Sequence, residues 1–281
     1  MKIHFVTGKG GVGKSAVAAA LAFRLSKEGE RVLLAELGDE SFYQEYFNLP
    51  LVDSVGRPSG LGFDVALWSG ASCLREYALH LLKVESLYKL FFENPVSRTL
   101  IQVAPGLSEL AITGKITSGP PRNVGPKMNY DVLVIDAFST GHFLALLRAP
   151  VGMAQAIGKG PIADQSKAIL EVLKDPKITS YHVVSLPEEL PTQESLELDR
   201  SLFDLVRVRS KLWLNKVVEY PDDLNPEGPE YEREFMIRRD RQRAITEIVE
   251  KEFQGRWAPL PLLFETSETK IVEQLAARMT V

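Results

Sequence analysis

A glycine-rich octapeptide near the amino terminus constrains the fold of this chain most strongly. GKGGVGKS occupies residues 8–15, directly after the apolar run KIHFVT, and it fits the phosphate-binding pattern G-x-x-x-x-G-K-[ST]. Its glycines let the backbone curl so that successive N–H groups point inward, and a helix that begins near Lys14 adds the positive end of its dipole. The segment therefore predicts a strand, an anion-binding turn and a helix.

The motif predicts roles for its residues. Lys14 would reach the β- and γ-phosphates, and the Ser15 hydroxyl would be a ligand of Mg²⁺. The remaining cradle residues would be Gly8, Lys9, Gly10, Gly11, Val12, Gly13 and Ala16. A glycine-rich turn without a ligand is the alternative, but the predicted strand before the loop and helix after it favour phosphate binding.

A magnesium–phosphate site also needs a carboxylate near a strand end. In YDVLVIDAFSTGH, residues 132–135 predict a buried strand that Asp136 ends. A lone aspartate after an apolar strand is usually a cap or turn residue. Beside a phosphate loop, we favour Asp136 as the residue that holds Mg²⁺ through water.

Short apolar runs alternate with helical patterns along the whole chain. Strands are predicted at residues 3–7, 31–36, 63–67, 100–104, 132–136, 182–186 and 212–215. Helices are predicted at residues 15–27, 74–92, 165–174, 192–209, 231–253 and 269–279. This alternation predicts an α/β fold with a doubly wound, mostly parallel sheet flanked by helices. We expect one domain over residues 1–281, with a small helical subregion around 70–98 and a reduced one around 143–176.

Composition excludes several classes of protein. The formal net charge of −4 gives no overall field that would attract nucleic acid. Cys73 is the one cysteine, so an internal disulfide or a cysteine-only zinc site within one chain is impossible. No apolar run approaches the roughly 18–20 residues of a transmembrane helix, and the start of the chain lacks the pattern of a secretory signal. We expect a cytoplasmic protein.

The second lysine of the octapeptide, Lys9, points to a particular family. GKGGVGKS resembles the deviant phosphate loop of the ArsA/MinD ATPases, which are P-loop NTPases of the SIMIBI type. In that group this lysine reaches across a dimer interface to the partner's nucleotide. The resemblance implies that ATP is the substrate, and that Lys9 supplies a positive charge in trans with the logic of an arginine finger.

Further segments are similar to the ArsA branch, which includes the arsenite-pump ATPase and the ATPases that target tail-anchored membrane proteins. DAFSTGH resembles its switch II, D-T-A-P-T-G-H, which implies switch roles for Asp136, Thr140, Gly141 and His142. APGLSELA at residues 104–111 and SLPEELPTQES at 185–195 resemble two other conserved segments of the branch. Asn215 stands where the family has its adenine-reading asparagine, and PLPLLFE, which contains Pro261, resembles the loop that closes over the base.

Switch I departs from the family pattern. Aligning VLLAELGDESF places Gly38 where the family has the aspartate that orients the attacking water. Glu36 and Asp39 flank that position, and we expect one of these carboxylates to take over the role. Slow or absent hydrolysis is the alternative.

Other features of the family that are missing here limit which kinds of partner we expect. Cys73 alone cannot form the family's multi-cysteine arsenite site, and the C-x-x-C that binds zinc between subunits is absent. The stretch after His142 is too short for the family's helical groove. The resemblance implies a nucleotide-dependent homodimer, or a heterodimer with a paralogue, together with a protein client whose candidates include membrane proteins. The apolar residues 74–92 could form core or a partner surface.

Two further readings of the function stay open. One is a nucleotide-binding module that hydrolyses poorly and pairs with an active paralogue. The other is a small-molecule kinase or ligase, which would share the phosphate loop but not the switch II and PGLSELA segments.

Overall fold

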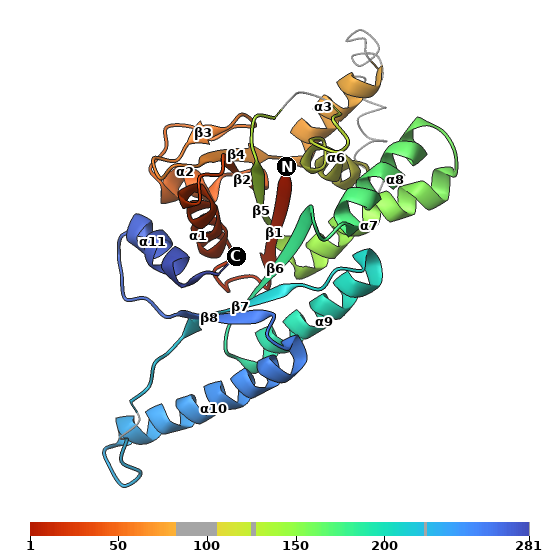
Figure 1. Ribbon diagram of the computed structural model, residues 1–281. Coiled ribbons are helices and arrows are strands. Elements are labelled where there is room, and N and C mark those ends of the chain that lie inside the picture. Colours follow the sequence, from red (N-terminus) through yellow and green to blue (C-terminus); the bar gives the residue numbers. More distant parts are fainter. Residues whose placement is uncertain (83–105, 125–127, 222–223, 281) are drawn as a thin grey trace.

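The computed structural model describes residues 1–82, 106–124, 128–221 and 224–280 (Figure 1). Its strands are β1 (Lys2–Gly8), β2 (Val32–Leu37), β3 (Arg57–Pro58), β4 (Asp64–Trp68), β5 (Val132–Ser139), β6 (Thr179–Ser185), β7 (Lys211–Val217) and β8 (Trp257–Pro261). They form one eight-stranded sheet in the order β3-β4-β2-β5-β1-β6-β7-β8. Every neighbouring pair is parallel except β3 and β4.

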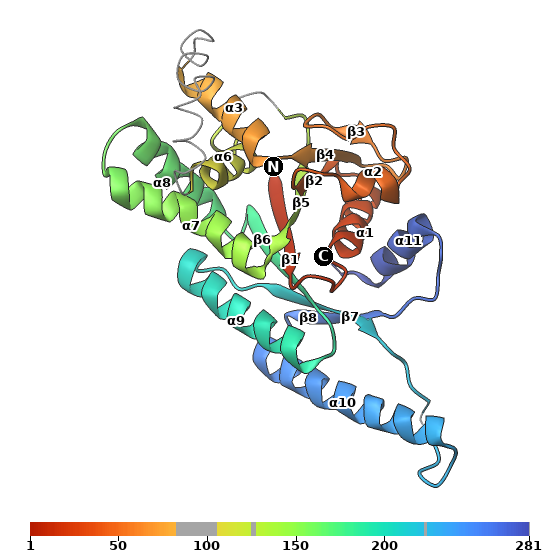
Figure 2. The same cartoon turned by 180° about the vertical axis from the view of Figure 1, so that it is seen from behind.

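Helices cover both faces of this sheet (Figures 1 and 2). They are α1 (Lys14–Lys27), α2 (Phe42–Tyr46), α3 (Gly70–Leu82), α6 (Leu107–Ile116), α7 (Thr140–Ile157), α8 (Pro161–Lys174), α9 (Glu189–Val206), α10 (Glu230–Phe253) and α11 (Glu268–Arg278). The predicted α/β fold with a mostly parallel sheet flanked by helices is confirmed.

The strands are buried on both sides, which explains their continuous apolar sequences. One core lies under α6, α7, α8 and α9 and includes Phe5, Ile135 and Tyr181. The other lies under α1 and α11 and includes Val134 and Trp213. Alternate residues of β1 and β5 enter opposite cores, as the two-residue period of a strand requires.

The carboxyl end of the sheet differs from the predicted strand limits in two places. β5 continues to Ser139, three residues beyond Asp136, because Gly8 pairs with Ser139 after a register shift and Thr7 donates from Oγ1 to the carbonyl of Phe138. β7 continues past Asn215 to Val217 through an irregularity at Lys216, whose φ is 59°. The prediction that Asp136 and Asn215 end their strands is therefore wrong by a few residues.

Four elements were not predicted by the sequence pattern: α2, α6, β3 and β8. Helix α7 lies mostly within the helical subregion expected around 143–176, but its limits were not predicted, and it has 18 residues despite containing Pro150 and Gly152. Burial of Phe143, Leu146 and Leu147 against the sheet stabilises it, which overrides its weak helix propensity. Predicted strand 100–104, and the parts of helix 74–92 and subregion 70–98 beyond residue 82, lie outside the described residues.

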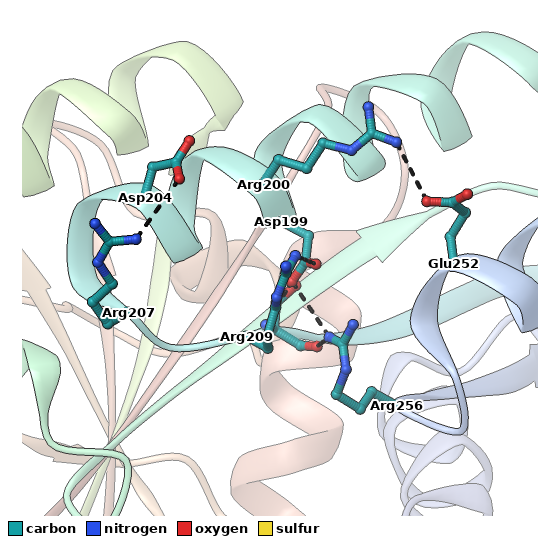
Figure 3. A network of polar contacts seen from close by, with 8 residues as sticks. Asp199, Arg200, Asp204, Arg207, Arg209, Glu252 and Arg256 are labelled. Carbon is teal, nitrogen blue, oxygen red and sulfur yellow. Dashed lines mark hydrogen bonds and ion pairs between the residues drawn. The ribbon is translucent and has the colours of Figure 1, made fainter.

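Helix α9 is shifted from its predicted limits of 192–209. It begins at Glu189 and ends at Val206, where Arg207 takes a left-handed φ of 61°. The chain then turns back into β7, and Asp199 stabilises this connection through hydrogen bonds. Its carboxylate accepts hydrogen bonds from Arg209 (2.9 Å) and from the backbone N–H and hydroxyl of Ser210 (2.8 and 2.7 Å), and it lies 3.4 Å from Arg256 (Figure 3).

Helix α10 extends away from the body of the molecule (Figures 1 and 2). Of its 24 residues only Val249 and Phe253 are buried, and the charged run YEREFMIRRDRQRA forms its outer part. Glutamate–arginine pairs such as Glu234–Arg238 (2.9 Å) support it locally. No helix in the described part of the chain is long and apolar enough to cross a bilayer.

Candidate functional site

The phosphate loop connects β1 to α1 in a conformation that needs glycine. At Gly8 (φ 148°) an added Cβ would lie 2.2 Å from the carbonyl oxygen of Val184 on β6, and at Gly13 (φ 90°) it would lie 2.5 Å from Nδ2 of Asn215. Both positions combine backbone angles that favour glycine with a close neighbour. The loop is thus held tightly between β6 and β7. A Cβ at Gly10 or Gly11 would meet nothing within 4 Å, so this part of the loop is open.

Lys14 lies at the first position of α1 and folds back over its own loop. Its Nζ donates to the carbonyl oxygen of Lys9 at 3.1 Å. Burial lowers the pKa of Lys14, and the nearby Asp136 carboxylate partly opposes this effect. A bond to a neutral carbonyl is weaker than a charge-assisted bond to phosphate, so Lys14 can exchange this partner for an anion.

Ser15, Asp136 and Tyr43 meet beside the start of α1. Asp136 accepts hydrogen bonds from Ser15 and from the Tyr43 hydroxyl at 2.9 Å, and that hydroxyl also lies 2.9 Å from the backbone oxygen of Ser15. Burial raises the pKa of Asp136, while these hydrogen bonds and the Lys14 charge lower it. A hydroxyl and a carboxylate oxygen are the hard ligands that Mg²⁺ prefers, so the predicted pair, Ser15 and Asp136, fits the ion.

The two candidate switch I carboxylates have different surroundings. Glu36 pairs in register with Asp136 across β2 and β5, and it accepts hydrogen bonds from the Ser41 hydroxyl and the Phe42 N–H, both at 2.8 Å. It therefore caps the start of α2. Burial raises the pKa of Glu36. Asp39 lies exposed in the loop between β2 and α2, next to the half-exposed Gly38.

The switch II segment crosses from β5 into α7. Thr140, Gly141 and His142 form the first turn of that helix. The His142 ring stacks on Phe138 with centroids 3.7 Å apart, and its Nε2 lies 3.8 Å from Glu109 of α6. Switch II therefore lies beside Glu109, which belongs to a segment that the sequence also indicated.

Asn215 lies on β7 and contacts the phosphate loop, and Pro261 lies on the neighbouring strand, β8. Asn215 is buried and donates from Nδ2 to the backbone oxygen of Val12 at 2.9 Å. One N–H of its amide is thus used to hold the phosphate loop, which leaves the second N–H and the side-chain oxygen for a base. Pro261 ends β8 opposite Val217. Phe264, in the segment that follows, is almost fully exposed.

Lys9 makes an ion pair within its own chain. Its Nζ lies 2.5 Å from Oε1 of Glu194 on α9. The sequence did not assign a role to Glu194, although it stands in the indicated segment SLPEELPTQES. Tyr43 was missed as well, because 93 residues separate it from Asp136 and nothing in the local pattern links them.

Comparison with known proteins gives a consistent result. A family model described as anion-transporting ATPase matches residues 1–38, which span β1, the phosphate loop, α1 and β2. ATPase BagA of Mycobacterium tuberculosis is 29% identical over 244 residues, which cover 81% of this chain and 68% of that protein. A putative arsenical pump-driving ATPase 2 of Aquifex aeolicus is 27% identical over 255 residues, with coverage of 79% and 83%. An ATPase ASNA1 homolog of Cryptosporidium parvum is 27% identical over 266 residues, with coverage of 81% and 68%.

Proposed function

Because this chain is related to the ArsA-type anion-transporting ATPases, as its motifs predict, we propose that it is a Mg²⁺-dependent ATP hydrolase that works as a nucleotide-driven dimeric switch. One observation carries the proposal. Lys14, Ser15 and the buried carboxylate of Asp136 converge at the carboxyl ends of β1 and β5, next to a loop whose glycines shape an anion cradle.

The roles of the residues follow from their positions. The loop N–H groups and Lys14 bind the phosphates, and Lys14 leaves the carbonyl of Lys9 to do so. Ser15 and Asp136 would hold Mg²⁺, which neutralises developing charge on the phosphates when it is bound. Tyr43 keeps the Asp136 carboxylate oriented. Asn215 and the chain after Pro261 would contact the base.

Asp39 is the better candidate to orient the attacking water. Glu36 is already occupied by two hydrogen bonds from the start of α2, whereas Asp39 is exposed on the flanking loop. The reaction adds the water oxygen to the γ-phosphorus and breaks its bond to the β-phosphate bridging oxygen, so that ADP and phosphate leave. Asp39→Asn should lower kcat more than Glu36→Gln, whose main effect should be on stability.

The dimeric switch is tested by ATP hydrolysis measured over a range of protein concentrations. Activity per subunit should rise with concentration, because each site needs Lys9 of the partner. Lys9→Ala and Lys14→Ala should each lower the rate at least about 100-fold. A Lys9→Ala protein with the rate of the unaltered protein would exclude the trans role while leaving the ATPase assignment intact.

A second candidate is a module that binds ATP, turns it over weakly and pairs with an active paralogue. Gly38 at the switch I position favours it. Tight ATP binding without hydrolysis at any protein concentration, followed by turnover when a paralogue is added, would support this candidate over the homodimer.

The client is proposed only by chemical class. Relatives carry names such as arsenical pump-driving ATPase, but Cys73 is buried against the core here, and burial raises its pKa to about 11. A buried, protonated thiol is a poor ligand for arsenite. We therefore favour a protein client, and we propose that the whole chain acts as one ATPase domain.

A further inference from the structure

The Lys9 ammonium is held by its own subunit. Its Nζ lies 2.5 Å from Glu194, and the two side chains are 38% and 39% exposed. The Lys9 peptide is held too, because its carbonyl oxygen accepts the hydrogen bond from Lys14. Both ends of this residue are thus engaged in cis.

The fold places the two partners beside each other and leaves little freedom for either backbone. Gly8 packs so closely on β6 that a methyl group there would overlap the Val184 carbonyl, which fixes the start of the loop against the strand that leads into α9. The first turns of α9 are anchored as well. Thr192 and Ser195 are buried, and their hydroxyls bond to the carbonyls of Leu186 and Pro191 at 3.2 and 2.7 Å.

The Lys9 ammonium cannot contact Glu194 and the partner's nucleotide at the same time. A side chain that neutralises the partner's nucleotide must extend away from its own loop, whereas the bond to Glu194 directs it onto α9 of the same subunit. We propose that Glu194 is a positioning residue that competes with the partner's ATP for Lys9, so that both Lys9–Glu194 pairs must open before two subunits close. This inference rests on the proposed function and adds a contact within the subunit that opposes dimerisation.

The two contacts of Lys9 within its own subunit open one after the other. Bound ATP takes Lys14 away from the Lys9 carbonyl, which frees the Lys9 peptide. The partner's ATP then draws the Lys9 ammonium from Glu194. A half-exposed ion pair changes an equilibrium by a factor of about 1.4 to 5. Two such pairs open in one dimer, so removal of both should tighten dimerisation about 2- to 30-fold.

The test is sedimentation velocity with Mg²⁺ and a non-hydrolysable ATP analogue. Glu194→Gln removes the charge and keeps the size of the side chain. Glu197→Gln is the matched control, because Glu197 lies nearly one turn further along α9, is exposed, and contacts Gln193 instead of Lys9. We expect Glu194→Gln to lower the dissociation constant of the dimer about 2- to 30-fold, and Glu197→Gln to leave it unchanged.

A double-mutant cycle shows whether the effect passes through Lys9. In a Lys9→Ala background, Glu194→Gln should no longer tighten the dimer. An unchanged or weakened dimer in the Glu194→Gln protein would overturn the proposal that Glu194 competes for Lys9. The same decrease in the dissociation constant with and without Lys9 would overturn it as well. Failure of the proposed function looks different: the unaltered protein would stay monomeric with the analogue at every concentration.

Discussion

At the scale of single residues, the site depends on a buried carboxylate whose ionised form needs partners. Asp136 has Ser15, Tyr43 and the charge of Lys14 to offset the cost of burial. Burial of a charge without such partners would protonate it. The aromatic hydroxyl of Tyr43 is the partner that lies outside the phosphate loop and α1, and it can be removed while the ring is kept.

Tyr43→Phe should affect both the metal site and stability. Loss of one hydrogen bond to a buried charged group should lower the free energy of unfolding by about 1–3 kcal/mol. The Mg²⁺ concentration needed for half-maximal ATP hydrolysis should rise about tenfold, as for residues that orient metal ligands. Tyr130→Phe is the control, because Tyr130 bonds to Asp64 in another part of the molecule. An unchanged Mg²⁺ requirement in Tyr43→Phe would remove Tyr43 from the site.

A buried histidine pair makes stability depend on pH. His4 Nδ1 and His182 Nε2 are 3.0 Å apart, and Trp213 donates to Nδ1 of His182 at 3.1 Å. Burial lowers both pKa values, that of His4 to about 4. Both rings are therefore neutral in the folded protein at pH 7, and both ionise in the unfolded chain below pH ~6.5.

The free energy of unfolding should therefore fall as the pH drops from about 6.5 towards 4. His4 alone accounts for a loss of roughly 3 kcal/mol at pH 4. Urea denaturation at pH 7, 6 and 5 measures this slope. His142→Gln should keep the slope, since His142 is exposed, whereas His4→Gln should flatten it. Equal slopes in both variants would mean that other groups set the acid limit.

At the scale of elements, the return from α9 to β7 depends on one acidic side chain. Asp199 is 7% exposed and binds Arg209, Ser210 and Arg256. Arg256 lies just before β8, so this carboxylate links α9 to the starts of the neighbouring strands β7 and β8. Figure 3 shows Asp199 beside Arg209 and Arg256, together with the separate pairs Arg200–Glu252 and Arg207–Asp204.

Asp199→Asn should lower the free energy of unfolding by about 1–3 kcal/mol, because it weakens the charge-assisted hydrogen bonds that a buried carboxylate makes with two partly exposed arginines. Asp204→Asn on the same helix is the control. Its contact with Arg207 is exposed and 3.9 Å long, so its effect should stay within about 0.5 kcal/mol. Thermal or urea unfolding compares the two. Equal losses would show that the network adds nothing to stability.

Helix α10 should differ in stability along its length. Its two buried residues, Val249 and Phe253, lie in its last turns, and Gln242 bonds to the backbone of Val218. The outer part has no buried residue, and an isolated helical segment is marginal in water. Amide hydrogens from Glu230 to about Arg241 should therefore exchange within seconds to minutes, and those near Val249 should exchange much more slowly. Hydrogen-exchange mass spectrometry tests this, and uniform protection along α10 would show that something else covers its outer part.

At the scale of the whole molecule, the strand order brings the candidate site together. β1 lies between β5 and β6, with β2 next to β5, so the loops that follow β1, β2, β5 and β6 emerge at one edge. Open parallel sheets bind ligands at such a point, where the chain winds to opposite faces. In this way residues that are far apart in the sequence, such as Lys9 and Glu194, become neighbours.

Nucleotide binding should stabilise the whole fold. A ligand at 100 times its dissociation constant adds about 2.7 kcal/mol, which corresponds to a rise in Tm of about 5 °C or more for a protein of this size. Mg²⁺–ATP should produce this rise in the unaltered protein and in Lys174→Ala, an exposed lysine at the end of α8. Lys14→Ala should lose most of it. A rise of equal size in Lys14→Ala would contradict ATP binding at this loop.

The sequence by itself determined the alternation of strands and helices, the glycine-rich loop with Lys14 and Ser15, and the apolar strand that carries Asp136. These features are local, since each depends on the periodicity or spacing of nearby residues, and the resemblance to the ArsA-type ATPases rests on the same motifs. Only the tertiary structure decided which distant side chains meet: Tyr43 with Asp136, Lys9 with Glu194, His4 with His182, and Asn215 with the loop backbone. Such pairs depend on strand order and on burial. Those properties arise when the whole sheet closes, and no single segment of the chain carries them.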